Sequence, residues 1–469
     1  MLETEIAIIG AGPAGLSAAL QASQAGATVT LIDEYHRPGG QYFKQPPASF
    51  RLLDRSILGR DHAAGEELIA RIEQGSVRVL HDTLLWAAFD PGVLDIYRDG
   101  RCERLKAERT IVATGAYDRP VAFPGWTLPG VITAGAAQTL AKGQWVLPGR
   151  RVLLAGTGPF LLPVAAQLVR GGAAVAGLLE ASHAGDWLRK MPAMWRHLDK
   201  ISEATDYLGA LLRARVPLRY GWTVLEARGS DRVEQAVIGR VDADGRPVPG
   251  TEEALEVDTI CIGFGFIPSL QLPRLLGCES RWDPDLGAWV TVADSDQRST
   301  VPSVFVAGET TGIGGHEIAM EEGAVAGIQA AADLGRLTPA DAEGHLARVR
   351  GELARHRAFA VYLNRTFSVK PGLLDLVRDD TILCRCEEVT AGEVATAARE
   401  WDGSLRTIKL LTRAGMGPCQ GRICGPLVAQ VAARESGRRI DEVGIDTPRP
   451  PIKPVPLGAI AGSDMARTS

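Results

Sequence analysis

One motif near the start constrains the fold most: an apolar run, Ile6-Ala7-Ile8-Ile9, leads directly into Gly10-Ala11-Gly12-Pro13-Ala14-Gly15. The run is typical of a buried strand and the residues that follow suit a helix, the context in which G-x-G-x-x-G binds dinucleotides. Gly10 allows a tight turn, Gly12 lets the backbone approach a pyrophosphate, and Gly15 lets the helix pack on the strand. Because the first N–H groups of the helix then face phosphate, we predict a cofactor site formed by Gly10, Gly12, Pro13, Ala14 and Gly15.

An acidic residue is expected about 20 residues after this motif, where the second strand ends and the ribose hydroxyls lie. Asp33 follows the β-type run 28–32 directly, and Glu34 comes next. The position favours Asp33 as the ribose ligand, with Glu34 as the open alternative.

A second strand–glycine–helix pattern starts at Val152-Leu153-Leu154-Ala155 and continues with Gly156-Thr157-Gly158. Its third glycine is missing and bulky residues follow, although Glu180 ends the next strand where it could bind a ribose. The pattern predicts a second doubly wound α/β domain. NAD(P)H, a non-redox nucleotide such as ATP, and a fold without a ligand remain open for it. Neither segment contains Cys-x-x-Cys, which excludes disulfide chemistry of the thioredoxin-reductase type.

Four of the seven cysteines are clustered near the C-terminus. Thiolates are soft ligands, and four from one chain suit tetrahedral zinc or an iron–sulfur cluster. The one-residue gap between Cys384 and Cys386 fits zinc poorly, since zinc sites usually space paired cysteines by two to four residues. Glycines around Cys419 and Cys424 can supply N–H donors to cluster sulfurs. The spacing favours an iron–sulfur cluster, with zinc and a vestigial, empty site as the open alternatives.

Composition narrows the class of protein. At roughly 100–200 residues per domain, 469 residues correspond to about two to four domains. The chain is 45% hydrophobic and 23% charged, ordinary globular values, and its net charge of −5 offers no broad basic face for nucleic acid. No apolar run approaches the about 18 residues of a membrane helix, and the acidic start lacks the positive region of a signal peptide. We expect a cytoplasmic protein with no membrane span and no nucleic-acid partner.

Further motifs give the chain a family resemblance. Gly39-Gly40-Gln41, Ala113-Thr114-Gly115 and Val306-Ala307-Gly308-Glu309 resemble the motifs of flavoproteins with two dinucleotide-binding domains. The resemblance implies FAD at the Gly10 motif, and Glu309 at the ribityl chain, where Asp is usual. We place His316 near the flavin, with a structural role at a helix start as the alternative. The further contacts implied are Gly40, Gln41, Ala113, Thr114, Gly115, Gly308 and Gly315.

The cysteine segment has a resemblance of its own. Residues 384–389 and 415–426 are similar to the [2Fe-2S] domain of bacterioferritin-associated ferredoxin, with four residues instead of two between the last cysteines. This resemblance implies a [2Fe-2S] cluster on Cys384, Cys386, Cys419 and Cys424.

Taken end to end, the chain resembles the FAD-containing large subunit of bacterial multisubunit amine dehydrogenases. These include opine oxidases, D-hydroxyproline and proline dehydrogenases, hydrogen cyanide synthase and, more distantly, heterotetrameric sarcosine oxidase. The implied fold is α/β, with two Rossmann-like domains of the glutathione-reductase type and a small helical C-terminal [2Fe-2S] domain. The predicted segments are 1–120 with 290–335 for FAD, 121–289 for the degenerate NAD(P)-like domain, 336–378 for a helical linker, 379–447 for the cluster, and 448–469 for a proline-rich tail that we expect to lie extended.

The resemblance also implies a function. The chain would pass on electrons taken from a smaller FAD subunit that oxidises an amine or imino acid, and would itself hold no catalytic residue. An FMN at the subunit interface and a small ferredoxin-like subunit belong to the same picture of a hetero-oligomer. Three alternatives stay open: a stand-alone NAD(P)H-dependent reductase, a hydrogen-cyanide-synthase subunit that acts on glycine, and a zinc-stabilised docking module without turnover.

Overall fold

Strand β1 (Leu2–Ile9) lies inside a seven-stranded sheet and carries the Gly10 turn at its end. The computed structural model describes residues 1–47, 49–50, 61–185 and 198–462. In the sheet order β3-β2-β1-β6-β5-β4, β1 runs parallel to β2 and β6, and β19 extends the sheet beside β6. This first unit comprises α1 (Pro13–Gln24), β2 (Val29–Ile32), α2 (Asp61–Glu73), β3 (Arg78–Leu80), β4 (Leu84–Asp90), β5 (Val93–Arg98), β6 (Arg101–Val112), β19 (Val304–Val306), η4 (Gly308–Thr310) and α8 (His316–Asp333).

The second unit is built on a five-stranded parallel sheet of order β11-β10-β9-β15-β8, with the Gly156 turn at the end of β9. A three-stranded antiparallel sheet, β12-β13-β14, packs beside it. Its elements are β8 (Val131–Thr133), α3 (Ala134–Thr139), η2 (Leu140–Gln144), β9 (Arg151–Gly156), α4 (Leu161–Arg170), β10 (Ala174–Glu180), α6 (Leu198–Arg213), β11 (Leu218–Tyr220), β12 (Trp222–Arg228), β13 (Gln235–Arg240), β14 (Glu253–Glu256) and β15 (Thr259–Gly263).

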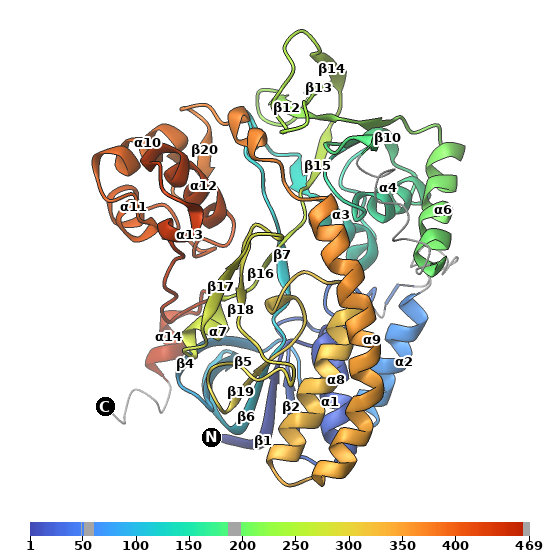
Figure 1. Cartoon of the computed structure of the whole chain (residues 1–469), viewed down its shortest axis with the longest axis vertical. Helices are drawn as coiled ribbons and strands as arrows, with labels where there is room; N and C mark the ends of the chain where they lie inside the picture. Colours follow the sequence, from blue (N-terminus) through green and yellow to red (C-terminus); the bar gives the residue numbers. More distant parts are fainter. Residues whose placement is uncertain (48, 51–60, 186–197, 463–469) are drawn as a thin grey trace.

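Two ribbons connect these units to each other and to the cysteine segment. Strand β7 (Ala116–Asp118) runs between the two units in Figure 1 and pairs antiparallel with β16 (Phe266–Pro268). After helix α7 (Gln271–Leu275), the hairpin of β17 (Ser280–Asp283) and β18 (Ala288–Thr291) faces the C-terminal elements.

The remaining elements form a long helix and a small helical domain. Helix α9 (Pro339–Thr366) packs along α8, as Figure 1 shows, and lies within the segment 336–378 that is predicted from the sequence to be a helical linker. The C-terminal elements are η5 (Pro371–Leu376), β20 (Ile382–Cys384), β21 (Val389–Thr390), α10 (Ala391–Glu400), α11 (Leu405–Thr412), α12 (Cys424–Ser436), α13 (Ile440–Val443) and α14 (Leu457–Ala461).

The proline-rich tail departs from the sequence prediction. It does not lie simply extended: Ile452 is buried, and its N–H donates to the Trp86 carbonyl at 2.9 Å. Helix α14 begins just after Pro456, and Ile460 packs near Trp86. Proline excludes a helix interior but is tolerated at a helix start, so the expectation that this tail lies extended is wrong for Leu457–Ala461.

Small residues allow α8 to press against α1, which starts at the Gly10 turn. A Cβ at Gly323 would lie 2.1 Å from the Ala14 carbonyl oxygen, and one at Gly327 would lie 2.4 Å from the Ala18 oxygen. Any side chain at these two positions would therefore push the helices apart.

We expect Gly323→Ala to lower the free energy of unfolding by roughly 1–3 kcal/mol, because the added methyl group overpacks the α1–α8 contact. Gly344→Ala in α9 is the matched control, since a Cβ there meets nothing within 4 Å. It should raise stability by up to about 1 kcal/mol through helix propensity alone. Denaturant unfolding followed by circular dichroism measures both, and equal behaviour of the two variants would contradict this packing account.

Candidate cofactor sites

Three loops meet at the Gly10 turn. Gly10 has φ +104°, and a Cβ there would lie 2.4 Å from the Ala113 carbonyl oxygen. A Cβ at Gly15 would lie 1.8 Å from the Gly10 oxygen, and one at Gly40 would lie 2.7 Å from the Gly12 Cα. The structure therefore brings together the predicted residues of segments 10–15, 39–41 and 113–115 around the N-terminus of α1, which is suited to phosphate.

The two acidic candidates for the ribose lie in different surroundings. Asp33 is buried, and its carboxylate accepts hydrogen bonds from the N–H groups of Ala11 (2.6 Å) and Tyr35 (2.8 Å). Burial raises the pKa of Asp33, while these hydrogen bonds oppose the rise. Glu34 is exposed and pairs with Lys453 of the tail. Asp33, and not Glu34, is the carboxylate at the glycine turn.

Aromatic and basic side chains surround the far end of this site. His316 begins α8 and stacks on Tyr42, with ring centroids 3.8 Å apart and planes 10° apart. The ammonium group of Lys142 lies 5.9 Å from the Tyr42 ring centroid, and that of Lys44 donates to the Gln41 side-chain oxygen at 3.0 Å. Burial lowers the pKa of Lys44.

Tyr42, Lys44 and Lys142 were not among the site residues predicted from the sequence. Tyr42 and Lys44 closely follow Gln41, so an interpretation that extended this loop could have included them. Lys142 lies in the π-helical turn η2, an element frequent at functional sites but without a recognisable sequence signal.

Two carboxyl groups lie at the same site, Glu322 buried and Glu309 partly buried. Glu322 accepts hydrogen bonds from the Gly308 N–H (2.9 Å), the Thr311 hydroxyl (2.8 Å) and the Arg357 guanidinium (2.8 Å). Burial of the Glu309 carboxyl raises its pKa to about 7, opposed by a hydrogen bond from the Gly315 N–H and reinforced by nearby Asp118 and Glu322. A Glu309 that is partly protonated near neutral pH can donate a hydrogen bond as well as accept one.

Glu309 should make stability depend on pH. Its folded pKa of about 7 lies above its ordinary value of 4.5, so its contribution is full below about pH 4.5 and is lost as the pH rises towards 7. We expect the unfolding free energy of the wild type, minus that of Glu309→Gln, to fall by up to about 3 kcal/mol over this window. Denaturant titrations at several pH values measure the difference, and a constant difference would contradict the raised pKa.

The second glycine turn is partly occupied by its own carboxylate. Buried Glu180 accepts hydrogen bonds from the Thr157 hydroxyl (2.8 Å), the Gly158 N–H (2.9 Å) and the Ser182 N–H (2.9 Å). A Cβ at Gly158 would lie 3.7 Å from the Phe367 Cβ, which follows α9. Glu180 therefore contacts its glycine turn much as Asp33 contacts the first turn, and these contacts leave open whether the second turn binds a nucleotide.

The four clustered cysteines contact one another through their thiols. Hydrogen bonding with Cys424 is the largest cause of the lowered pKa of Cys384, to about 6, and of Cys419, to about 5. The same interactions raise the pKa of Cys424, and Cys386 interacts with Cys419. A Cβ at Gly417 would lie 2.1 Å from the Cys386 Cβ, so only glycine fits beside this thiol.

The geometry of these thiols bears on the kind of group they could hold. Over the described ranges between residues 1 and 462, no three or more His, Cys, Asp or Glu side chains surround a single ion position. The thiols instead contact one another in the order Cys384, Cys424, Cys419 and Cys386. These soft donors, two of which have a lowered pKa, fit an iron–sulfur cluster. In such a cluster the four cysteines are divided between two irons.

A cleft that the sequence does not reveal lies between the flavoprotein body and the cysteine domain. It is lined on one side by Tyr117, Arg274 and Trp289. The other side is formed by Lys409 of α11, by Gly421 just before α12 and by Asp446 in the segment after α13. The cleft therefore adjoins the second cysteine loop directly.

Comparison with known proteins decides the family. Residues 4–333 match the family described as pyridine nucleotide-disulphide oxidoreductase, and residues 380–463 match the sarcosine oxidase A3 domain. The chain belongs to the pyridine nucleotide-disulphide oxidoreductase family. The predicted oxidoreductase of the FAD type, with a Rossmann-like α/β fold, is confirmed.

Relatives of this oxidoreductase are subunits of larger enzymes. It is 35% identical to the opine oxidase A subunit of Rhizobium meliloti (strain 1021), over 97% of both chains. It is 32% identical to hydrogen cyanide synthase subunit HcnB of Pseudomonas aeruginosa, over 96% of this chain and 97% of the relative. The sarcosine oxidase alpha subunit of Corynebacterium sp. (strain P-1) is 26% identical, and the match covers 98% of this chain but 45% of that longer protein. The predicted resemblance to subunits of multisubunit amine dehydrogenases is confirmed.

Solved structures support the fold of the oxidoreductase. L-Proline dehydrogenase from P. horikoshii has a TM-score of 0.71 at 23% identity, covering 98% of this chain and 80% of that one. Thioredoxin reductase from T. acidophilum has a TM-score of 0.52 at 18% identity, and the match covers 71% of this chain and 99% of that one. Among the described residues, no helix has both the length and the apolar character needed to cross a membrane.

Proposed function

We propose that this chain is the electron-transferring subunit of a multisubunit amine or imino-acid dehydrogenase of the opine, D-hydroxyproline or proline class, and that it holds FAD and a [2Fe-2S] cluster. The observation that carries the proposal is the presence of two separate candidate redox sites on one chain. These are the glycine turn with Asp33 and the four mutually contacting thiols. The end-to-end likeness to the opine oxidase A subunit supports it.

The residues that would hold FAD are those around the Gly10 turn. The first N–H groups of α1 would face the pyrophosphate, and Asp33 would bind a ribose. Gln41 and His316 would lie at the flavin, and Glu309 would contact the ribityl hydroxyls with its partly protonated carboxyl. FAD can accept two electrons together and release them one at a time, which suits a chain placed between an amine and a one-electron cluster.

Cys384, Cys386, Cys419 and Cys424 would hold the cluster. The lowered pKa values of Cys384 and Cys419 favour the thiolate forms that bind iron. Close approach at Gly417 and backbone N–H groups from Gly415 and Gly421 would surround the sulfurs, as expected for a site that tunes a cluster through hydrogen bonds.

The amine would be oxidised elsewhere. We propose a smaller FAD subunit that removes two electrons and two protons from the C–N bond of the substrate, an FMN at the subunit interface, and a small ferredoxin-like subunit in the same cytoplasmic complex. The likeness to HcnB keeps a hydrogen-cyanide-synthase type of complex, acting on glycine, as the second candidate. The missing third glycine after Gly156 and Gly158 disfavours a stand-alone NAD(P)H reductase.

The anaerobically purified chain tests this function through its visible spectrum and an iron and sulfide assay. We expect flavin bands, a broad cluster absorbance and two irons per chain. NADH should leave the flavin oxidised, and opines, proline, D-hydroxyproline and glycine should reduce it only after the partner subunit is added. Rapid bleaching by NADH would replace the proposal with a reductase, turnover of an amine by this chain alone would overturn it, and zinc without sulfide would select a docking module.

Cys419→Ser should remove most of the bound iron and sulfide, because one iron loses a thiolate that is ionised near neutral pH. Cys278→Ser is the matched control, since this buried thiol lies 3.3 Å from the Ser299 hydroxyl and outside the cysteine loops. Iron analysis compares the two, and flavin content shows whether each variant still folds. Unchanged iron in Cys419→Ser would contradict the ligand assignment.

A further inference from the structure

One stretch of chain, residues 113–126, touches both candidate redox sites; we name it the bridging segment. Its first residue, Ala113, places its carbonyl against Gly10 at the FAD turn. It continues through β7 in the middle of the molecule and ends at Trp126 beside the cysteine domain. A single continuous stretch of chain therefore contacts both sites.

The first cysteine loop is bound to this segment by Arg385, which lies between Cys384 and Cys386 in the sequence. The Arg385 guanidinium lies 4.5 Å from the Trp126 ring centroid and donates to the Trp126 carbonyl oxygen. In return the Trp126 indole N–H donates to the Ile382 carbonyl at 2.6 Å. Trp126 is 3% exposed, so the indole side of these contacts is shielded from water, whereas the Arg385 side chain is exposed.

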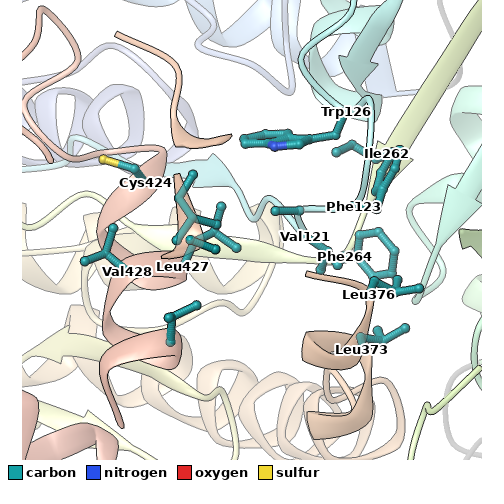
Figure 2. Packing of buried hydrophobic residues seen from close by; sticks show 14 of the residues in the cluster. Val121, Phe123, Trp126, Ile262, Phe264, Leu373, Leu376, Cys424, Leu427 and Val428 are labelled. Atoms are coloured by element: carbon teal, nitrogen blue, oxygen red, sulfur yellow. The ribbon is translucent and has the colours of Figure 1, made fainter. Parts of the chain in front are cut away.

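Figure 2 shows the apolar side of this contact. The Trp126 indole lies between Cys424 and Leu427 of α12 on one side and Phe123 and Ile262 of the flavoprotein body on the other. One set of buried apolar side chains thus crosses the boundary between the body and the cysteine domain. It includes Cys424, a proposed ligand of the iron–sulfur cluster.

The second cysteine loop has a corresponding arginine. Arg422, between Cys419 and Cys424, lies with its guanidinium 5.8 Å from the ring centroid of Tyr117 in β7. It also donates to the carbonyl oxygens of Cys419 at 3.1 Å and Ile452 at 2.7 Å. Both loops therefore turn an arginine towards an aromatic ring of the bridging segment.

We propose that Arg385 with Trp126, and Arg422 with Tyr117, are positioning pairs that fix the two cysteine loops on the bridging segment and so set the placement of the cluster relative to the flavin. The inference rests on the proposed function only in so far as the loops hold a cluster. Two guanidinium charges beside it also favour its reduced form, which carries one more negative charge, and so raise its reduction potential.

Hydrogen exchange and a redox titration of the holoprotein test these pairs. In Arg385→Gln, amide exchange in peptides covering 382–388 should accelerate roughly tenfold, because a cation–π contact with the buried Trp126 ring and a hydrogen bond to its carbonyl are both lost. The cluster potential, followed by its EPR signal, should shift to a more negative value. Arg385→Lys should recover the potential but only part of the protection, since ammonium keeps the charge without the planar stacking.

Arg413→Gln is the matched control. It removes the same charge from the cysteine domain near Cys386, likewise from an exposed side chain, but Arg413 pairs with Glu387 at 2.9 Å. Trp126→Phe retains a ring while it removes the donor to Ile382, so it should accelerate exchange with less risk of unfolding than Trp126→Ala. If Arg385→Gln and Trp126→Phe exchange like the wild type, or if Arg413→Gln shifts the potential as much as Arg385→Gln, the positioning role is overturned.

The two proposals can fail separately. A wild-type chain without iron and sulfide would overturn the proposed function, whereas the exchange experiment on that chain would still decide whether these pairs dock the loops. A chain that holds a cluster, but whose cluster potential and amide exchange stay unchanged when Arg385 or Trp126 is substituted, would overturn only the positioning pairs.

Discussion

The close approach of Gly10 to the Ala113 carbonyl is the contact on which the rest of the molecule depends. A Cβ at this point would lie 2.4 Å from that oxygen, so only glycine lets the ends of β1 and β6 lie together. This close contact places the first turn of α1 so that its free N–H groups can bind an anion. The bridging segment begins at Ala113 in the same contact, so the geometry of the turn fixes the start of the segment that runs towards the cysteine domain.

Charge is arranged differently at the two candidate redox sites. Around the flavin end, carboxyl groups are desolvated, and Glu309 has a pKa of about 7. Around the cysteines, hydrogen bonds from Cys424 lower the pKa of Cys384 and Cys419, and two arginine side chains lie over aromatic rings nearby. The carboxyl groups at the flavin end can take up protons, which suits electron transfer that is coupled to proton transfer. The groups around the cysteines stabilise negative charge, which suits a site that transfers electrons alone.

Much of this could be predicted from local sequence. The Gly10 motif, the second βαβ unit and the helix at 339–366 follow from periodicity and glycine spacing, and the structure contains all three. The cysteine ligand set remains a prediction, which the mutual contacts of the thiols support. The expectation of an extended tail is wrong, because the proline content does not reveal that Ile452 is buried among core residues of the first unit and that its N–H donates to the Trp86 carbonyl.

What could not be predicted depends on contacts distant in sequence. Trp126 and Ile382 are 256 residues apart, yet the indole N–H of one donates to the carbonyl of the other. Stacking of Tyr42 on His316, and the position of Lys142 above it, likewise require the assembled fold. Side chains at such positions carry no spacing signal, so only the structure identifies them.

Low-temperature EPR of the reconstituted complex, frozen after addition of an amine, tests the central claim most directly. The account predicts the signal of a reduced [2Fe-2S] cluster when both this chain and its partner are present, and none with this chain alone. A cluster signal from this chain and amine without the partner would contradict it. So would a complex in which the partner flavin is reduced while the cluster stays oxidised.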